Sequence, residues 1–194
     1  QDELLFFFLR IRRPPGSTLF PSTTLFRSLR FQSWAQSLTT AILQPMRLSI
    51  SNHSRDLAGL TYVYPVVSRR AGGVSIGINL NPNNACNFRC IYCQVPNLIR
   101  GSAPEIDLDL LQTELNTFLQ IATQTDWLTT EVPEGSQTLQ DIAFSGNGEP
   151  TSAEPLDEIF TLVANAATQH DLDLPLILIT NGSHATTSRV QEAL

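Results

Sequence analysis

The fold is decided by the stretch V-S-I-G-I-N-L-N-P-N-N-A-C-N-F-R-C-I-Y-C-Q, from Val74 to Gln94. This stretch also contains all the cysteines of the chain. In Val74–Leu80, apolar residues alternate with serine, glycine and asparagine, which predicts a β-strand with one apolar face. The N-P-N-N segment at 81–84 ends this strand, and a cysteine-containing loop follows directly.

The loop contains three cysteines in a C-x3-C-x2-C arrangement, Cys86, Cys90 and Cys93. Because few residues separate them, their thiols can converge on one metal centre. A [4Fe-4S] cluster in an electron carrier normally has four cysteine ligands. Three cysteines would therefore leave one iron free to bind a ligand that is not part of the protein.

After this loop, helical and strand patterns alternate. Apolar residues recur at helical spacing after Asp107, a suitable N-cap, and again after Pro155, which suits a first helical turn. Short apolar strands are predicted at 141–145 and 174–180, and a third helix over 186–194. Right-handed crossovers make such strands parallel, so the sequence predicts an α/β fold.

Three polar motifs follow the ends of the predicted parallel strands. They are the cysteine loop, G-N-G-E at 146–149 and N-G at 181–182. Parallel strands bring their carboxyl ends to one edge, where α/β proteins bind ligands. The second and third motifs are also typical of plain turns, so their shared position is the stronger signal.

C-N-F-R-C-I-Y-C resembles the C-x3-C-x-aromatic-C motif of the radical S-adenosylmethionine (SAM) superfamily, and the later G-N-G-E-P and T-N-G segments follow that family's order. The resemblance covers Val74 to Leu194 and is closest to the wyosine-synthase-like branch, whose second motif often reads G-E-P-T, as at Gly148–Thr151. It implies the N-terminal half of a partial (β/α)6 TIM-like barrel with parallel strands.

In such enzymes, SAM binds the iron that lacks a cysteine ligand. One electron from the cluster then cleaves SAM into methionine and a 5′-deoxyadenosyl radical, which abstracts hydrogen from a substrate. The resemblance implies that Cys86, Cys90 and Cys93 hold the cluster. It also implies reduced flavodoxin or ferredoxin as the electron donor. The substrate stays open between a tRNA base and a small molecule or peptide.

The same resemblance implies five positions that bind SAM. Tyr92 stands where the family places an aromatic or apolar residue against the adenine. Gly148 and Glu149 match the motif that receives the amino group of SAM. Asn147 stands where the family more often has glycine, and Asn181 would line the same edge.

Two other classes of function are compatible with the cysteines. A zinc-binding interaction module would need a fourth ligand, for which His53, His170 and His184 are the available histidines. A simple iron–sulfur electron carrier would need a fourth thiolate, which the chain lacks.

Composition limits the possible environments. The 194-residue chain has a net charge of −6, and all 12 of its basic residues are arginine, which weakly disfavours a nucleic-acid surface. No apolar run approaches the roughly 20 residues of a membrane span. Clustered cysteines without partners elsewhere favour a reducing cytoplasm.

The N-terminal part of the chain is predicted to differ from the rest in origin and structure. Residues 1–28 resemble translated sequencing-adapter sequence, so we expect 1–45 to be a non-native or disordered leader, with Met46 as the natural start. Residues 46–73 are expected to form a pre-barrel segment with a strand at Leu60–Val67. Residues 74–194 would then be a truncated barrel whose last strand has an open edge.

Overall fold

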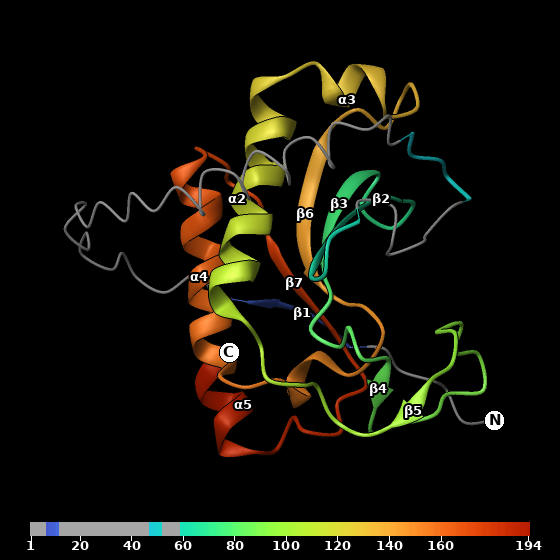
Figure 1. Ribbon diagram of the computed structural model, residues 1–194, viewed down its shortest axis with the longest axis vertical. Coiled ribbons are helices and arrows are strands. Elements are labelled where there is room, and N and C mark those ends of the chain that lie inside the picture. Colours follow the sequence, from blue (N-terminus) through green and yellow to red (C-terminus); the bar gives the residue numbers. More distant parts are fainter. Residues whose placement is uncertain (1–6, 12–46, 52–58) are drawn as a thin grey trace.

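The computed structural model describes residues 7–11, 47–51 and 59–194 and has a mixed α/β architecture (Figure 1). Its central sheet has five strands in the order β1-β7-β6-β3-β2. These strands are β1 (Phe7–Ile11), β2 (Val63–Ser68), β3 (Gly73–Ile78), β6 (Leu139–Phe144) and β7 (Leu176–Thr180). Because β1 and β2 are edges, the described strands form an open sheet and not a closed barrel.

The three inner strands are parallel, as predicted. β6 pairs with β3 on one side and with β7 on the other, with Ile142 opposite Ile76 and Phe144 opposite Leu178. This arrangement confirms the α/β class and the parallel order of the strands. It also brings the carboxyl ends of β3, β6 and β7 to the same edge.

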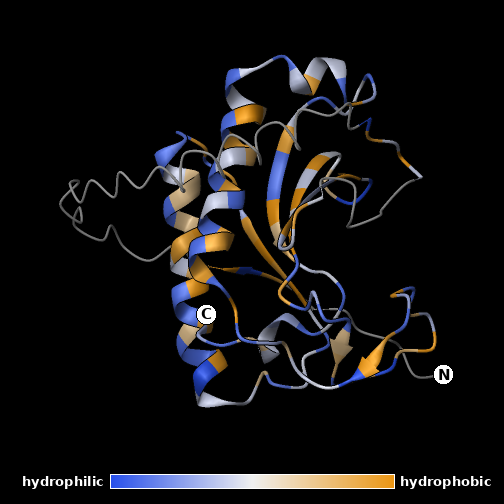
Figure 2. Cartoon of the chain, viewed as in Figure 1, coloured by the Kyte–Doolittle hydropathy of each residue, from blue (hydrophilic) through white to orange (hydrophobic). Residues whose placement is uncertain are grey.

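Two amphipathic helices, α2 (Leu108–Gln124) and α4 (Leu156–Gln169), pack together beside the sheet (Figure 1). Asp107 caps α2 by accepting a hydrogen bond from the backbone N–H of Leu110 (2.9 Å). Phe160 of α4 packs against Phe144 of β6, with ring centroids 4.5 Å apart. Both helices that the sequence predicted after Asp107 and Pro155 are therefore confirmed. Hydrophobic residues concentrate in the strands and along these helices (Figure 2).

Shorter helices complete the described part of the chain. α5 (Ser188–Ala193) lies within the segment predicted to be helical, whereas α3 (Trp127–Thr130) lies between the first predicted helix and the strand at 141–145, where no helix was predicted. Trp127 explains the difference, because its buried ring packs edge-to-face on Phe118 of α2. None of the described helices is long and apolar enough to cross a membrane.

The strand predicted at Leu60–Val67 begins later, at Val63, and is antiparallel to β3. All six residues of β3 are buried, including the small residues on its polar face. The ring of Tyr64 on β2 covers this face at Gly77, where a Cβ atom would overlap the ring. Glycine is therefore required at this position by packing.

A buried carboxylate fixes the start of β2. Glu114 of α2 accepts hydrogen bonds from the backbone N–H groups of Thr61, Tyr62 and Val63 at 2.8, 2.8 and 3.2 Å. Burial raises the pKa of this carboxyl above its ordinary value, and the three N–H donors oppose that rise. Helix α2 thereby holds the strand that carries Tyr64.

The edge of β7 is covered by part of the leader. Phe7–Ile11 forms β1, which pairs antiparallel with β7 and places Leu9 opposite Leu178. The edge that we expected to be open is therefore paired. Met46 and the rest of the predicted leader lie outside the described residues.

The contact between Gly77 and Tyr64 predicts the effect of a single methyl group. Gly77→Ala should lower the free energy of unfolding by about 1–3 kcal/mol, because the tyrosine ring must move. Urea unfolding of the full chain measures this cost. In a Tyr64→Leu background the same substitution should cost less, and an equal cost in both backgrounds would contradict the packing argument.

Candidate functional site

A cavity of about 590 Å³ lies at the carboxyl ends of β3, β6 and β7. All eight residues that the resemblance assigns to the cluster and to SAM line it: Cys86, Cys90, Tyr92, Cys93, Asn147, Gly148, Glu149 and Asn181. The volume falls within the range of small-molecule sites in proteins. The predicted meeting of the three motifs at one edge is thus confirmed.

The cysteine loop projects from a small parallel strand pair, β4 (Ala85–Cys86) and β5 (Ile99–Arg100), that the sequence did not predict (Figure 1). The backbone N–H of Phe88 donates to Cys86 Sγ (3.5 Å), and the N–H of Cys93 donates to the Cys90 carbonyl (3.1 Å). These bonds curl the loop so that its thiols line one cavity.

The three cysteines are free thiols, with Cys93 exposed and the other two partly buried. Within the described residues, no group of three or more His, Cys, Asp or Glu side chains is arranged to hold a metal ion. The cysteines therefore share a loop and a cavity but do not form a finished ligand set. Three thiols have the donor chemistry and number for an iron–sulfur cluster with one open iron, but the loop would have to draw them together to hold it.

Two groups in the loop have raised pKa values. Burial raises the pKa of the Cys86 thiol, and the hydrogen bond from Phe88 opposes this rise. A side-chain hydrogen bond to Cys90 raises the pKa of Tyr92 to about 12. The Tyr92 ring is partly exposed at the cavity, which leaves it accessible to a flat apolar ligand.

Glu149 joins the second and third motifs. The carboxylate is only 2% exposed, and its Oε1 atom accepts hydrogen bonds from Thr151 N–H (3.2 Å), Thr151 Oγ1 (2.6 Å) and Thr180 Oγ1 (2.5 Å). Its Oε2 atom accepts one bond, from the backbone N–H of Asn181 (2.7 Å). Since a carboxylate oxygen has about two lone-pair sites, only Oε2 keeps capacity for a further donor.

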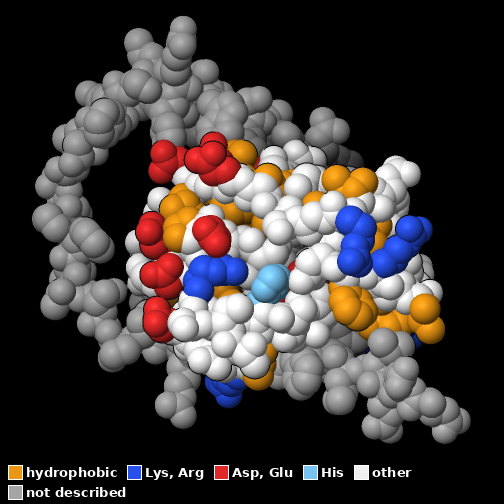
Figure 3. All heavy atoms as spheres, turned by 90° about the horizontal axis from the view of Figure 1, so that it is seen from below, with side chains coloured by type: hydrophobic (Ala, Val, Ile, Leu, Met, Phe, Trp, Pro, Cys, Tyr) orange, Lys and Arg blue, Asp and Glu red, His pale blue; other side chains and the backbone are white. Residues whose placement is uncertain are grey.

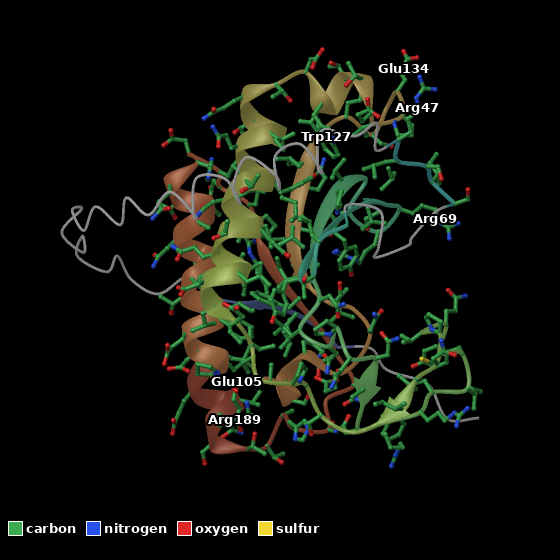
Figure 4. All side chains as sticks on the ribbon, in the orientation of Figure 1. Arg47, Arg69, Glu105, Trp127, Glu134 and Arg189 are labelled. Carbon is green, nitrogen blue, oxygen red and sulfur yellow. The ribbon has the colours of Figure 1, made fainter. Side chains whose placement is uncertain are left out.

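The turn after Glu149 is clamped from the C-terminal helix. η1 (Pro150–Ser152) is a single 3₁₀ turn, and Arg189 of α5 donates hydrogen bonds to the carbonyls of Thr151 (2.8 Å) and Ala153 (2.7 Å) (Figure 4). Arg189 also forms an ion pair with Glu154 (3.5 Å). Helix α5 therefore helps to hold the loop that carries Glu149.

Asparagine side chains tie the cysteine loop to the second motif. Asn79 Oδ1, at the end of β3, accepts a hydrogen bond from the backbone N–H of Asn147 (3.0 Å). Asn84, which adopts a left-handed backbone conformation, accepts a hydrogen bond from Asn147 Nδ2 (2.7 Å). The Oδ1 atom of Asn147 is buried and has no hydrogen-bond partner. An unpaired buried acceptor costs about 1–3 kcal/mol, so this atom is suited to a ligand donor.

Gly148 is explained by the approach of two loops. A Cβ atom at this position would overlap the carbonyl oxygen of Ala85, the residue before Cys86, and would crowd the Asn81 side chain. Asn81 Nδ2 donates to the same Ala85 carbonyl (2.9 Å). The glycine thus allows the second motif to pack directly on the base of the cysteine loop.

The third motif contacts the cysteine loop through Asn87. Asn181 Nδ2 donates to Asn87 Oδ1 (3.1 Å), and Asn87 Nδ2 lies 2.7 Å from Ser183 Oγ and 3.0 Å from His184 Nε2. His184, one of the histidines available as a zinc ligand, therefore lies beside the cysteine loop and contacts it through Asn87. His170 lies at the C-cap of α4, and His53 is outside the described residues.

Sequence reasoning missed three hydroxyl groups of the cavity. Tyr64 on β2 and Ser145 after β6 line it, and their hydroxyl oxygens are 2.7 Å apart. No local motif marks Tyr64, because its place depends on the antiparallel pairing of β2 with β3. Thr180 also lines the cavity and was not predicted, although it is the last residue of a predicted strand and could have been found from that position.

Comparisons with known proteins give partial matches. The chain is 29% identical to a GTPase Obg of Brachyspira hyodysenteriae over 145 residues. This match covers 72% of this chain and 18% of that protein. It is 31% identical over 119 residues to a UPF0026 protein of Methanocaldococcus jannaschii, 61% of this chain and 32% of that protein. A UPF0026 protein of Helicobacter pylori is 26% identical over 131 residues, 67% of this chain and 37% of that protein.

The chain thus spans less than two fifths of the length of these relatives. No family model matches it, and no solved structure matches it.

The hydrogen bonds of Glu149 predict a large effect of its removal. Glu149→Ala should lower the free energy of unfolding by about 2–4 kcal/mol, because several buried donors lose their acceptor. Urea unfolding measures this, with Glu105→Ala as a control, since Glu105 is exposed. Equal effects of the two substitutions would contradict the joining role of Glu149.

The raised pKa of Cys86 predicts slow alkylation. At a given pH below its pKa the folded chain holds less Cys86 thiolate than the unfolded chain, and the thiolate is the reactive form. Mass spectrometry after iodoacetamide treatment across a pH series should show the half-maximal rate at higher pH in the folded, metal-free chain than in urea. An equal or lower midpoint in the folded chain would refute the burial of Cys86.

Proposed function

We propose that this chain carries the cofactor site of a radical SAM enzyme on the first half of a partial (β/α)6 barrel. One observation supports this above all: the three cysteines of a C-x3-C-x2-C loop line the same cavity as Gly148, Glu149 and Asn181. When bound, a [4Fe-4S] cluster and SAM would supply a 5′-deoxyadenosyl radical that abstracts hydrogen from the substrate.

In this proposal, Cys86, Cys90 and Cys93 bind three irons as thiolates. The N–H of Phe88, which already donates to Cys86 Sγ, would stabilise the negative charge of that thiolate. The described residues provide no fourth cysteine and no histidine bonded to the loop other than through Asn87. One iron is then left for the amino and carboxylate groups of SAM.

Two oxygen atoms of the cavity are suited to the amino group of SAM. Asn147 Oδ1 is buried without a partner, and Glu149 Oε2 accepts only one hydrogen bond. An amino group that binds iron through its lone pair keeps two N–H donors, one for each of these oxygens. Asn147 would therefore contribute through its side chain at a position where the family more often has glycine. Tyr92 would contact the adenine through its partly exposed ring.

The remaining strands of the barrel would lie in the part of a longer protein that this chain does not cover. The chain matches about a third of each UPF0026 relative, which leaves room for such strands. Residues on those strands would determine whether the substrate is a tRNA base or a small molecule or peptide. We further propose a cytoplasmic location, with a reduced flavodoxin or ferredoxin as the electron donor.

The name of the first relative suggests a different activity, GTP hydrolysis. A P-loop requires a lysine that contacts the β- and γ-phosphates. The chain contains no lysine and no G-x-x-x-x-G-K-[ST] sequence, so it cannot supply this site. We therefore do not extend that activity to this chain.

Anaerobic reconstitution of the full chain with iron and sulfide tests the proposal. The reduced protein should give an EPR spectrum that changes when SAM is added, and it should release 5′-deoxyadenosine. Cys90→Ala should abolish both signals, whereas Arg69→Ala, in the β2–β3 turn far from the cavity, should preserve them (Figure 4). An EPR spectrum that does not change when SAM is added would instead indicate an electron carrier. A colourless protein that holds stoichiometric zinc would indicate a zinc-binding interaction module.

A further inference from the structure

Two hydroxyl groups of the cavity take no part in the proposed cofactor binding. Tyr64 of β2 and Ser145, directly after β6, both line the cavity, and their hydroxyl oxygens are 2.7 Å apart. We call these two groups the hydroxyl pair. Side chains alternate along a strand, so Ser145 lies on the opposite face of the sheet from Phe144, whose ring packs on α4. The hydroxyl pair therefore lies on the face of the sheet that is turned away from this helix.

Packing fixes the position of the hydroxyl pair. Tyr64 stands opposite Gly77 in the register of β2 and β3, and its ring lies so close to this glycine that a Cβ atom there would overlap it. Only 5% of Tyr64 is exposed. Ser145 is held by its backbone N–H, which donates to the carbonyl of Ile78 (3.1 Å). A ligand would therefore meet a preorganised partner, which lowers the entropic cost of binding.

The hydroxyl pair has one more proton than its own contacts use well. Each hydroxyl has one donor and two acceptor lone pairs. The hydrogen bond between the two oxygens takes up one proton. The other acceptor among the described residues is the Ala143 carbonyl, 3.4 Å from Ser145 Oγ, whereas a good O–H···O bond spans about 2.5–3.0 Å. One O–H donor is therefore left for a ligand atom that accepts a hydrogen bond.

The cavity offers no cation to an anionic ligand. Among the described residues that line it, none is arginine, lysine or histidine, and the one carboxylate is that of Glu149. On the face seen in Figure 3, arginine side chains gather mainly on the side of β4 and β5. Neither Arg89 nor Arg100 lines the cavity. A carboxylate or phosphate at the hydroxyl pair would lose water without gaining a countercharge, which costs far more than for a neutral group.

Apolar side chains complete the surroundings of the hydroxyl pair. Ile179 of β7 lies on the same face as Ser145, because the residues before them pair in the register of β6 and β7. Ile179 lines the cavity, as do Val95 and Leu98 from the loop after the cysteines. A few fixed polar groups among apolar walls are typical of sites that orient a small neutral ligand.

We propose that the hydroxyl pair binds a neutral carbonyl group of the substrate and so positions the substrate for hydrogen abstraction. This inference rests on the proposed function and narrows its substrate to one chemical class. The reacting end is an amide or a cyclic amide and carries neither a carboxylate nor a phosphate. The spare hydroxyl proton donates a hydrogen bond to the carbonyl oxygen, and no covalent bond forms or breaks in this binding step.

Binding of benzamide, a flat neutral amide, to the full metal-free chain tests the proposal. In an NMR titration, the backbone amide signals of Ser145 and Gly146 should shift. Tyr64→Phe combined with Ser145→Ala removes both hydroxyls and should raise the dissociation constant about 3- to 10-fold, since one neutral hydrogen bond is lost. Unaltered amide signals elsewhere show that this double variant is folded.

Tyr62→Phe is the matched control. The Tyr62 hydroxyl accepts a hydrogen bond from the backbone N–H of Asp107 (3.1 Å), and neither residue lines the cavity. This variant should bind benzamide as the wild type does. Equal dissociation constants for the double variant and Tyr62→Phe, or no shift at Ser145 and Gly146, would overturn the proposal.

Charged and natural amide probes test the substrate class. Benzoate has the shape of benzamide and a negative charge at neutral pH, so it should bind the wild type at least about 10-fold more weakly. Equal affinities would contradict the preference for a neutral group. Uridine and N-acetylalaninamide then distinguish a nucleobase from a peptide as the source of the carbonyl. The matching probe should bind the double variant more weakly, and an unaltered affinity for both would count against the proposal.

These titrations need no cluster, so their outcome is separate from that of the proposed function. If the hydroxyl pair binds neutral amides but the reconstituted chain releases no 5′-deoxyadenosine, the proposed function fails and the binding site remains. If 5′-deoxyadenosine is released while the double variant binds every amide probe as the wild type does, the assignment of the hydroxyl pair fails by itself.

Discussion

The buried carboxylate of Glu149 is the interaction on which the cavity depends. It gathers hydrogen bonds from the turn that follows it and from the end of β7, so the loops after two parallel strands cannot separate without leaving buried donors unpaired. Gly148, directly before it, packs on the base of the cysteine loop. Two adjacent residues thereby fix all three motifs relative to one another.

The site is made almost entirely of loop residues, yet it is well supported. Parallel strands determine where the loops begin, and the amide groups of asparagines then join one loop to the next. Asn79 and Asn84 hold the second motif, and Asn87 holds the third. These contacts leave the thiols outside any disulfide bond and leave one buried oxygen of the site, Asn147 Oδ1, without a protein partner. The groups left over are the ones that we propose for cofactor binding.

Periodicity in the sequence was enough to predict the α/β class, both long helices and the parallel inner strands, because a helix or buried strand repeats its apolar residues locally. The meeting of the cysteines with Gly148, Glu149 and Asn181 also followed, since strand ends share an edge. Long-range pairing was not predictable. Tyr64 reaches the cavity only because β2 turns back on β3, and Phe7–Ile11 covers β7 from a segment whose composition gave no such signal.

The central claim is that three thiolates of this chain hold a cluster with one iron open to SAM. Mössbauer spectroscopy of the chain, reconstituted anaerobically with ⁵⁷Fe, tests it most directly. We predict that adding SAM shifts the signal of one iron in four and leaves the other three unaltered. Four irons that respond alike, or a chain that assembles no cluster while its cysteines are intact and reduced, would contradict the claim.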